Sequence, residues 1–209
     1  MQAFVAAARE VARQGLVIAN SGNLSWRTGD GLVLVTGTRS WMERLTEDDV
    51  AVFRLADGEQ VSGAKPSVES MFHLGIYRER PEIDVVLHYQ TRDATAVASM
   101  APGPTDYFVI PETAYYIGPI ASVPFLLPGS EELAEAVVSA AKRHNLVQMR
   151  NHGQVTVGKT FDDVILKGLF FEMACSVIAR AGQRLTHLPE ELAETMCQWG
   201  RESRSEGGA

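Results

Sequence analysis

Short apolar runs alternate along this chain with longer segments of helical spacing. Positions 32–35 are an uninterrupted aliphatic run, which is typical of a buried strand. Residues 161–181 instead have the length and composition of a long helix with a largely apolar surface. Strands that alternate with helices predict an α/β domain in which helices cover both faces of one central sheet. The hairpin signal Asp57-Gly58 and the strand return at 154–158 indicate antiparallel pairs within that sheet.

The size and charge of the chain narrow the classes of protein that fit it. With 209 residues, 45% hydrophobic and 22% charged, it is long enough for a single domain with a full core, which we place at residues 1–200. A net charge of −7, a pI near 5.3 and the lack of a basic run argue against a nucleic-acid partner. The longest apolar runs fall far short of the roughly 20 residues that span a bilayer, so we expect no membrane partner either.

The cysteines and the two ends of the chain bear on its location. Cys175 and Cys197 do not form a CxxC pair, and two thiols in a chain of this size predict a reducing, cytoplasmic compartment. Residues 1–15 carry charges within their apolar pattern, so we expect no signal peptide. The polar, glycine-rich residues 201–209 are predicted to form a disordered tail.

Histidines stand where two of the predicted strands end. His88 and Gln90 follow the apolar run 83–87, and residues two apart on a strand face the same way. Together with His152, and with Glu69 as a fourth ligand or a base, they are candidate ligands for Zn²⁺, Mn²⁺ or Co²⁺. On spacing alone, the competing interpretation that each histidine only caps a strand and bonds a backbone carbonyl is the stronger one. The histidines for which we expect no catalytic role are His73, His144 and His187.

Two glycine-containing loops could hold an anion. Glycine lets backbone N–H groups approach an anion closely, which makes Gly22 and its neighbour Asn23 candidate phosphate ligands. Thr38 adds a hydroxyl donor, and Arg39 can bind a phosphate or carboxylate through two parallel hydrogen bonds. Ser67, which we expect to cap a helix beginning near it, would add the helix N-terminus to such a site. Ordinary turns explain each of these stretches equally well.

The order of these clusters carries more information than any one of them. In order along the chain they are Gly22-Asn23-Leu24-Ser25, Thr36-Gly37-Thr38-Arg39, Lys65-Pro66-Ser67-Val68-Glu69, His88-x-Gln90 and Asn151-His152-Gly153. This ordered set resembles the class II aldolase/adducin family over residues 3–181. The resemblance implies a three-layer α/β/α fold with a mostly antiparallel central sheet, and commonly a homotetramer with active sites at subunit interfaces.

The same resemblance assigns roles to individual residues. It implies a divalent metal, most often zinc, held by His88, position 90 and His152, with Glu69 as the acid/base. A tyrosine downstream of position 90 would donate a proton; of Tyr107, Tyr115 and Tyr116 in that region, we take Tyr115. A role as aromatic core or interface residues is the competing and slightly stronger interpretation of all three. The residues that it implies for the substrate phosphate are Gly22, Asn23, Thr38 and Ser67.

The sequence departs from the family pattern at three positions. Gln90 stands where the family has a second histidine, and an amide oxygen is a weaker ligand than imidazole for zinc. Arg39 replaces a glycine, which mildly favours an acidic substrate, and Val68 replaces a serine of the phosphate grip. Each change alters what the site would bind.

From the resemblance we expect a metal-dependent aldolase-type lyase that acts on a small hydroxylated carbonyl compound, a sugar phosphate, through an enediolate. Alternatives on the same scaffold are an epimerase, a dehydratase or a decarboxylase. A non-catalytic, adducin-like assembly protein is the other alternative. Retention of His88, His152 and Glu69 argues against that last interpretation, while Gln90 argues for it.

Overall fold

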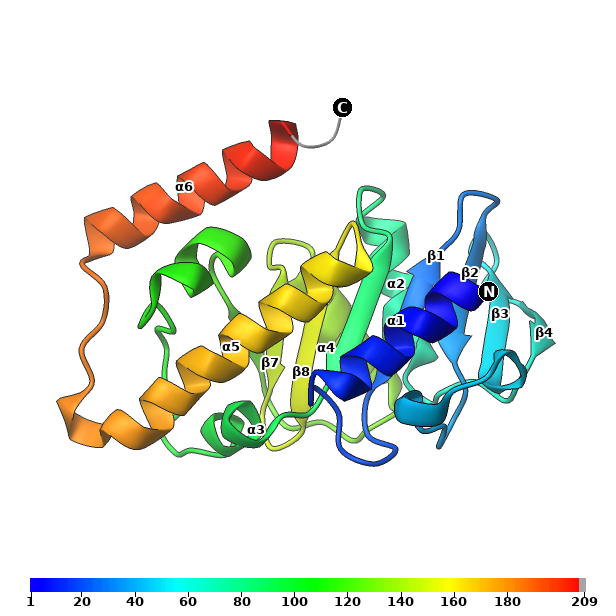
Figure 1. The fold of residues 1–209 in the computed structure, drawn as a ribbon, viewed down its shortest axis with the longest axis horizontal. Helices are drawn as coiled ribbons and strands as arrows, with labels where there is room; N and C mark the ends of the chain where they lie inside the picture. The colour runs from blue at the N-terminus through cyan, green and yellow to red at the C-terminus, as the bar shows by residue number, and fades with distance from the viewer. Residues whose placement is uncertain (207–209) are drawn as a thin grey trace.

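A computed structural model describes residues 1–206 as three layers, with a sheet between two sets of helices (Figure 1). Over these residues the sheet has eight strands, and every neighbouring pair is antiparallel except β6 with β7. The predicted α/β/α fold with a mostly antiparallel sheet is therefore confirmed. In sheet order the strands are β4 (Gln60–Gly63), β3 (Val50–Arg54), β2 (Leu32–Thr36), β1 (Asn23–Arg27), β5 (Val85–Tyr89), β8 (Gly153–Gly158), β7 (Leu146–Met149) and β6 (Ala121–Val123).

Helices cover both faces of this sheet and bury two separate cores. α1 and α5 lie on the face turned toward the viewer of Figure 1, while α2 and α4 pack against the other face. Alternate side chains of each strand enter opposite cores, as the pleat requires. In β5, Leu87 belongs to the α1/α5 core and Val86 to the α2/α4 core. The helices are α1 (Gln2–Arg13), α2 (Ser70–Glu79), α3 (Arg92–Ala98), α4 (Glu131–Ala141), α5 (Phe161–Ala181) and α6 (Glu190–Glu206), with short turns η1 (Met42–Arg44), η2 (Glu47–Asp49), η3 (Thr113–Ile117) and η4 (Gly182–Arg184).

Strand β5 lies at the centre of the sheet, between β1 and β8. Its register sets His88 opposite Asn23 on one side and opposite Val155 on the other. By alternation, His88 projects into the α2/α4 layer, where Phe72 of α2 meets its ring edge to face at 6.1 Å between centroids. The end of the central strand therefore carries its histidine toward the start of α2.

Two local predictions differ from the structure. Helix α2 begins at Ser70, so Ser67 is not its N-cap; Ser67 Oγ instead accepts the N–H of Glu69 within the preceding turn, at 3.3 Å. Between 115 and 125 we expected one or two short strands, but only β6 forms, preceded by the π-helical turn η3. Thr113 stabilises that turn by donating its hydroxyl to the carbonyls of Tyr107 and Ile110.

The C-terminal segment also differs from its prediction. α6 continues to Glu206, so residues 201–206 are helical where the sequence predicts a disordered tail, and positions 207–209 of that prediction lie outside the described residues. Arg204 explains the difference, because its guanidinium donates to the backbone carbonyls of Tyr115 and Tyr116 in η3, at 2.9 and 3.2 Å. Among residues 1–206 no helix is long and apolar enough to cross a bilayer.

Candidate metal centre

Three side chains that the sequence singled out converge in the structure. Potential ligand atoms of Glu69, His88 and His152 all lie within 4.8 Å of one another. Glu69 precedes α2, His88 is the next-to-last residue of β5, and His152 lies in the turn between β7 and β8. Glu69 and His88 are buried and His152 is half-buried, so a group held between them would be shielded from solvent.

The tautomer of His88 is fixed by the neighbouring strand. Its Nδ1–H donates to the backbone carbonyl of Gln154 in β8, at 2.9 Å. In the neutral ring Nε2 then carries only a lone pair, and it faces Oε2 of Glu69 at 3.4 Å. A lone pair and a carboxylate repel each other unless a cation or proton lies between them. A carbonyl that orients the far ring nitrogen is the usual support for a metal-binding histidine.

The turn that carries His152 depends on both of its neighbours. Asn151 has a φ of +53°, in the left-handed region that asparagine tolerates better than most residues. At Gly153 an added Cβ would lie 2.7 Å from the Tyr89 carbonyl oxygen and 3.0 Å from the His88 ring, so only glycine lets β8 approach β5 this closely. The sequence Asn-His-Gly is therefore what brings the His152 ring to 5.0 Å from that of His88, centroid to centroid.

The charges of the cluster suit a divalent cation. Burial lowers the pKa of His152 to about 4, with a further contribution from His88, so the ring is neutral at neutral pH. Its Nε2 lies 3.3 Å from Oε1 of Glu69, and that oxygen is buried without any hydrogen-bond partner among the described residues. Two imidazoles, with one carboxylate as a further ligand or as an acid/base, suit zinc and similar metals. The residues present thus fit a bound metal.

Gln90 lies beside this cluster. Its side-chain amide nitrogen donates to the backbone carbonyl of His152 at 3.0 Å, and its Cγ packs against Gly153. Gln90 therefore supports the turn that presents His152. Its role as a third metal ligand stays a prediction.

A buried chain of hydrogen bonds approaches Glu69 from the opposite side. The Asn23 side-chain amide donates to Oε2 of Glu69 at 2.8 Å and to Ser67 Oγ at 3.1 Å. Asn23 Oδ1 pairs with Nε2 of His73 at 2.5 Å, and the other ring nitrogen of His73 pairs with Ser25 Oγ at 2.6 Å. The Tyr77 hydroxyl lies 2.7 Å from Ser25 Oγ and completes the chain.

The direction of every bond in this chain follows from its chemistry. An amide oxygen only accepts, so Nε2 of His73 carries the hydrogen. Burial lowers the pKa of His73 to about 3, so the ring is neutral and its Nδ1 accepts from Ser25. Ser25 then accepts from Tyr77, and all donors point from Tyr77 toward Glu69. The chain thereby fixes the Asn23 amide with its hydrogens on Glu69 and Ser67.

His73 is a residue that sequence analysis assigned no role. It contacts Asn23, and through Asn23 it positions Glu69. A signal for it was present, because His73 follows Glu69 by four residues, the spacing that places two side chains on one face of a helix. In this arrangement Asn23 has no amide hydrogen left to donate to a phosphate, since both already have partners. Phosphate binding by Asn23 stays a prediction.

The remaining predicted phosphate residues gather near Ser67. Gly22 has a φ of +72°, and an added Cβ would lie 2.6 Å from the His88 carbonyl oxygen, so its glycine is required by close packing. Gly37 pairs with Pro66 in an isolated bridge and the Thr38 N–H donates to the Lys65 carbonyl at 2.9 Å, which brings this loop against the segment that leads to Ser67. Arg39, in the same loop, is exposed and has a φ of +61°.

Tyr115 is not brought to the cluster within this chain. It is in η3, its ring meets that of Tyr116 at 4.8 Å, and its carbonyl accepts from Arg204. Figure 1 shows η3 beside α6, at the end of the sheet opposite α3, which directly follows the His88 strand.

A cavity of about 450 Å³ adjoins the cluster through His152 and Gln90. Among the described residues that line it, the one side chain with a permanent charge is Arg92, at the start of α3. The other lining residues are Ile18, Ser21, Thr91 and Thr95. A small anionic compound could therefore lie beside His152 with its charge near Arg92.

We predict that His73→Gln flattens the acid dependence of stability. Because the folded pKa of His73, about 3, is below that of a free histidine, unfolding takes up a proton between about pH 6.5 and pH 3, and stability falls as the pH is lowered through that window. Removing the imidazole should reduce the slope of the unfolding free energy by up to about 1.4 kcal/mol per pH unit. Urea titrations at a series of pH values measure the slope, and His187→Gln, on the exposed linker before α6, controls for loss of a histidine. Equal slopes in wild type and His73→Gln would contradict a neutral His73.

Comparison with known proteins agrees with this architecture. A family model described as Class II Aldolase and Adducin N-terminal domain matches residues 2–179. The chain is 32% identical over 158 residues to a 3-oxo-tetronate 4-phosphate decarboxylase of Haemophilus influenzae, covering 74% of this chain and 75% of that one. It is 31% identical over 164 residues to an L-fuculose phosphate aldolase of Methanocaldococcus jannaschii, covering 78% and 87%.

Solved structures give the same result for the fold. YgbL of Klebsiella pneumoniae superposes with a TM-score of 0.87 at 25% identity, over 93% of this chain and 96% of that one. An L-fuculose 1-phosphate aldolase superposes with a TM-score of 0.80 at 23% identity, over 94% and 93%. The family consists of divalent-metal-dependent lyases and related enzymes. On the extent of the family match, the chain belongs to the class II aldolase/adducin family.

Proposed function

We propose that this protein is a metal-dependent lyase that decarboxylates a small phosphorylated 3-oxo acid. The observation that carries the proposal is the asymmetric environment of Glu69, one oxygen of which is held by Asn23 while the other faces His152 without a hydrogen-bond partner among the described residues. A carboxylate held at one oxygen can exchange a proton at the other without changing its orientation.

The metal that fits the cluster would supply Lewis-acid polarisation of the substrate carbonyl. We take zinc as the first choice, because His88 and His152 offer nitrogen ligands, with manganese or cobalt as alternatives. His88 would be held in position by Gln154, and His152 by the close approach of β8 to β5.

The proposed reaction has two steps, the loss of CO₂ and the transfer of a proton to the carbon left behind. As the bond between C1 and C2 breaks, CO₂ leaves and the electron pair passes onto the oxygen at C3. One proton must then reach C2, so the overall reaction consumes a proton. In this proposal the free Oε1 of Glu69 delivers it, having been protonated from solvent beforehand.

The two anionic ends of such a substrate need separate donors. Ser67 and Thr38, with the backbone near Gly22, would hold the phosphate, and Asn23 would contribute if its bond to Ser67 opened. Arg92 in the adjoining cavity, or Arg39 on the nearby loop, would hold the carboxylate. A cation at the carboxylate fits the substrate class named for the decarboxylase relatives.

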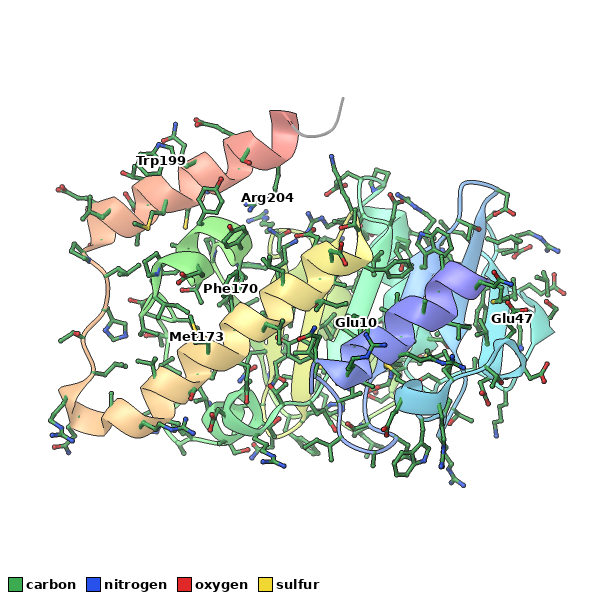
Figure 2. All side chains as sticks on the ribbon, in the orientation of Figure 1. Glu10, Glu47, Phe170, Met173, Trp199 and Arg204 are labelled. Carbon is green, nitrogen blue, oxygen red and sulfur yellow. The ribbon has the colours of Figure 1, made fainter. Side chains whose placement is uncertain are left out.

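Aldol cleavage of a ketose phosphate is the second candidate. The fuculose phosphate aldolases among the relatives favour it, and Glu69 could serve as its acid/base too. Tyr115, the expected proton donor of an aldolase, lies apart from the cluster, so a role for it requires a second subunit. We therefore include a homotetramer in the proposal, and we place it in the cytoplasm. The exposed apolar side chains of α5 and α6, such as Met173 and Trp199 in Figure 2, would suit subunit contacts.

The proposal predicts that the metal-loaded protein releases CO₂ from 3-oxo-tetronate 4-phosphate faster than it cleaves L-fuculose 1-phosphate. In D₂O the decarboxylation product should carry one deuterium at the hydroxymethyl carbon that was C2 of the substrate. Glu69→Gln should lower kcat about 10²- to 10⁴-fold, because the proton donor is lost. Glu79→Gln, at the exposed far end of α2, the helix that Glu69 precedes, is the matched control. Preferred cleavage of the fuculose compound would support the aldolase instead, and activity on neither would contradict the substrate class.

We also predict that Gln90→His raises the affinity for zinc by at least about tenfold, equivalent to about 1.4 kcal/mol. Imidazole is a better zinc ligand than an amide oxygen, and position 90 lies against the turn of His152. Titration against a competing chelator measures the affinity, with Gln14→His at the exposed end of α1 as the control for an added histidine. An affinity unchanged from wild type would show that residue 90 is outside the coordination sphere.

Two substitutions of Arg39 can separate its contribution to substrate binding from the strain of its backbone. Arg39→Gly and Arg39→Ala both remove the guanidinium, so both should raise KM for an anionic substrate, by about tenfold for one lost charge-assisted bond. Only glycine relieves the φ of +61°, so the glycine variant should be more stable than the alanine variant by about 1 kcal/mol. Steady-state kinetics and thermal unfolding test the two effects. An unchanged KM in both variants would exclude Arg39 from substrate binding.

A further inference from the structure

A second cavity, of about 570 Å³, lies between α6 and the start of α5. It is formed by the last turns of α6, the turn that joins β8 to α5, and the segment after α2. In Figure 2, Arg204 reaches from α6 toward the rest of the domain on this side. The cavity lies at the end of β8 that carries Gly158, whereas the metal centre lies at the end that carries Gly153.

The lining of this cavity is strongly cationic in an acidic protein. The whole chain has 19 Lys and Arg against 26 Asp and Glu. Among the residues whose side chains the structure describes, two carboxylates, Glu82 and Asp163, line the cavity. The cationic lining residues are Arg80, Arg143, Lys159, Lys167, Arg201 and Arg204. Random placement of charge on an acidic surface would not gather so many cations around one hollow, so the cavity has a local potential opposite to the net charge of the chain.

Half of these cations already have structural partners. Arg80 pairs with Glu82 at 2.7 Å, and Lys167 pairs with Asp163 at 2.8 Å and donates to the Val157 carbonyl at 2.8 Å. Arg204 donates to the carbonyls of η3. These three side chains and the two carboxylates form the wall and floor of the cavity, and both carboxylates of its described lining are thereby paired with cations.

The other three cations have no such partner. Among residues 1–204, whose side chains the structure describes, Arg143, Lys159 and Arg201 make no ion pair and no side-chain hydrogen bond with another residue. All three are exposed, and they come from three different elements: the end of α4, the β8–α5 turn and α6. Three separate elements thus present free donors to one hollow.

The buried cations show the electrostatic consequence. Burial lowers the pKa of Lys167, and the positive charges of Arg204 and Arg80 lower it further, against the opposing effect of Asp163. Burial likewise lowers the pKa of Arg204, and Arg201 adds to that effect. The cations therefore disfavour one another, and an anion placed among them would relieve that repulsion.

We propose that this cavity is a second anion site, distinct from the metal centre, that binds a small phosphorylated compound through Arg143, Lys159 and Arg201. Its volume admits a compound of metabolite size rather than a lone ion. Tetrahedral oxyanions suit three donors that converge from separate elements, and arginine binds them through two parallel hydrogen bonds. The bound compound would connect α6 to the start of α5.

Binding of inorganic phosphate to the whole protein tests this proposal, with calorimetry at fixed ionic strength as the measurement. Wild type should bind phosphate in the cavity, and Lys159→Gln/Arg201→Gln should weaken that binding by about tenfold or more. Both side chains are exposed, so the variant should fold, which circular dichroism checks. Arg13→Gln/Arg184→Gln removes the same charge at exposed positions outside the cavity and should bind as wild type does.

A second pair of substitutions separates this cavity from the phosphate position of the proposed active site. Thr38→Val/Ser67→Ala should remove the active-site phosphate and leave the cavity phosphate in place. If the proposed function fails and the cavity proposal holds, wild type binds one phosphate, which the Lys159/Arg201 variant loses. Tungstate soaked into crystals, a heavy tetrahedral analogue, should give anomalous density among the three cations.

Two results would overturn the proposal. One is phosphate binding that is equal in wild type, in the Lys159/Arg201 variant and in the Arg13/Arg184 control. The other is a change of oligomeric state in the Lys159/Arg201 variant, measured by sedimentation, without phosphate binding to wild type. That result would mean that acidic groups of a second copy of the chain, and not a small compound, neutralise the cavity.

Discussion

The antiparallel register of β5 between β1 and β8 determines the geometry of the candidate metal centre. It sets His88 opposite Asn23 on one side, and on the other it brings the Gln154 carbonyl to Nδ1 of the same histidine. A shift of one residue would turn His88 into the α1/α5 core and leave a buried imidazole without its carbonyl, a loss of about 1–3 kcal/mol for the unsatisfied group alone. The cores on both faces prevent that shift, so the packing of apolar residues far from the site holds its ligands in place.

Glu69 is held in a different way, by a chain of hydrogen bonds whose donors all point in one direction. Every donor from Tyr77 through Ser25 and His73 to Asn23 points the same way, so no member can rotate without leaving a buried group unpaired. Such a chain stabilises one orientation of the carboxylate and leaves its second oxygen unengaged. A residue that exchanges a proton needs this combination, since orientation limits the rate as strongly as basicity does.

Features that depend on residues close together in the sequence could be predicted, whereas features that depend on contacts between distant segments could not. The layers and the long helix α5 follow from local apolar patterns, and the candidate ligands stand at strand ends that those patterns locate. The resemblance to a family joined clusters as distant as Glu69 and His152, which no local pattern connects. What stayed hidden depends on contacts between distant segments: the helical residues 201–206 need Arg204 to reach η3, and His73 needs the strand that carries Asn23. Spacing can place His73 on one helix face with Glu69, but residue types and spacing do not encode its pairing with a distant strand.

Strand β8 belongs to both sites of the molecule. Near its start the Gln154 carbonyl accepts from His88 of the candidate metal centre, and three residues later the Val157 carbonyl accepts from Lys167 beside the cationic cavity. At about 3.4 Å per residue, these two carbonyls are roughly 10 Å apart along one strand. Because β8 pairs with β5 on one side and β7 on the other, it cannot slide without breaking both ladders. A displacement of β8 at the cavity would therefore be resisted by the same backbone hydrogen bonds that orient the candidate metal ligands. The two ends of the sheet are thus coupled through this strand.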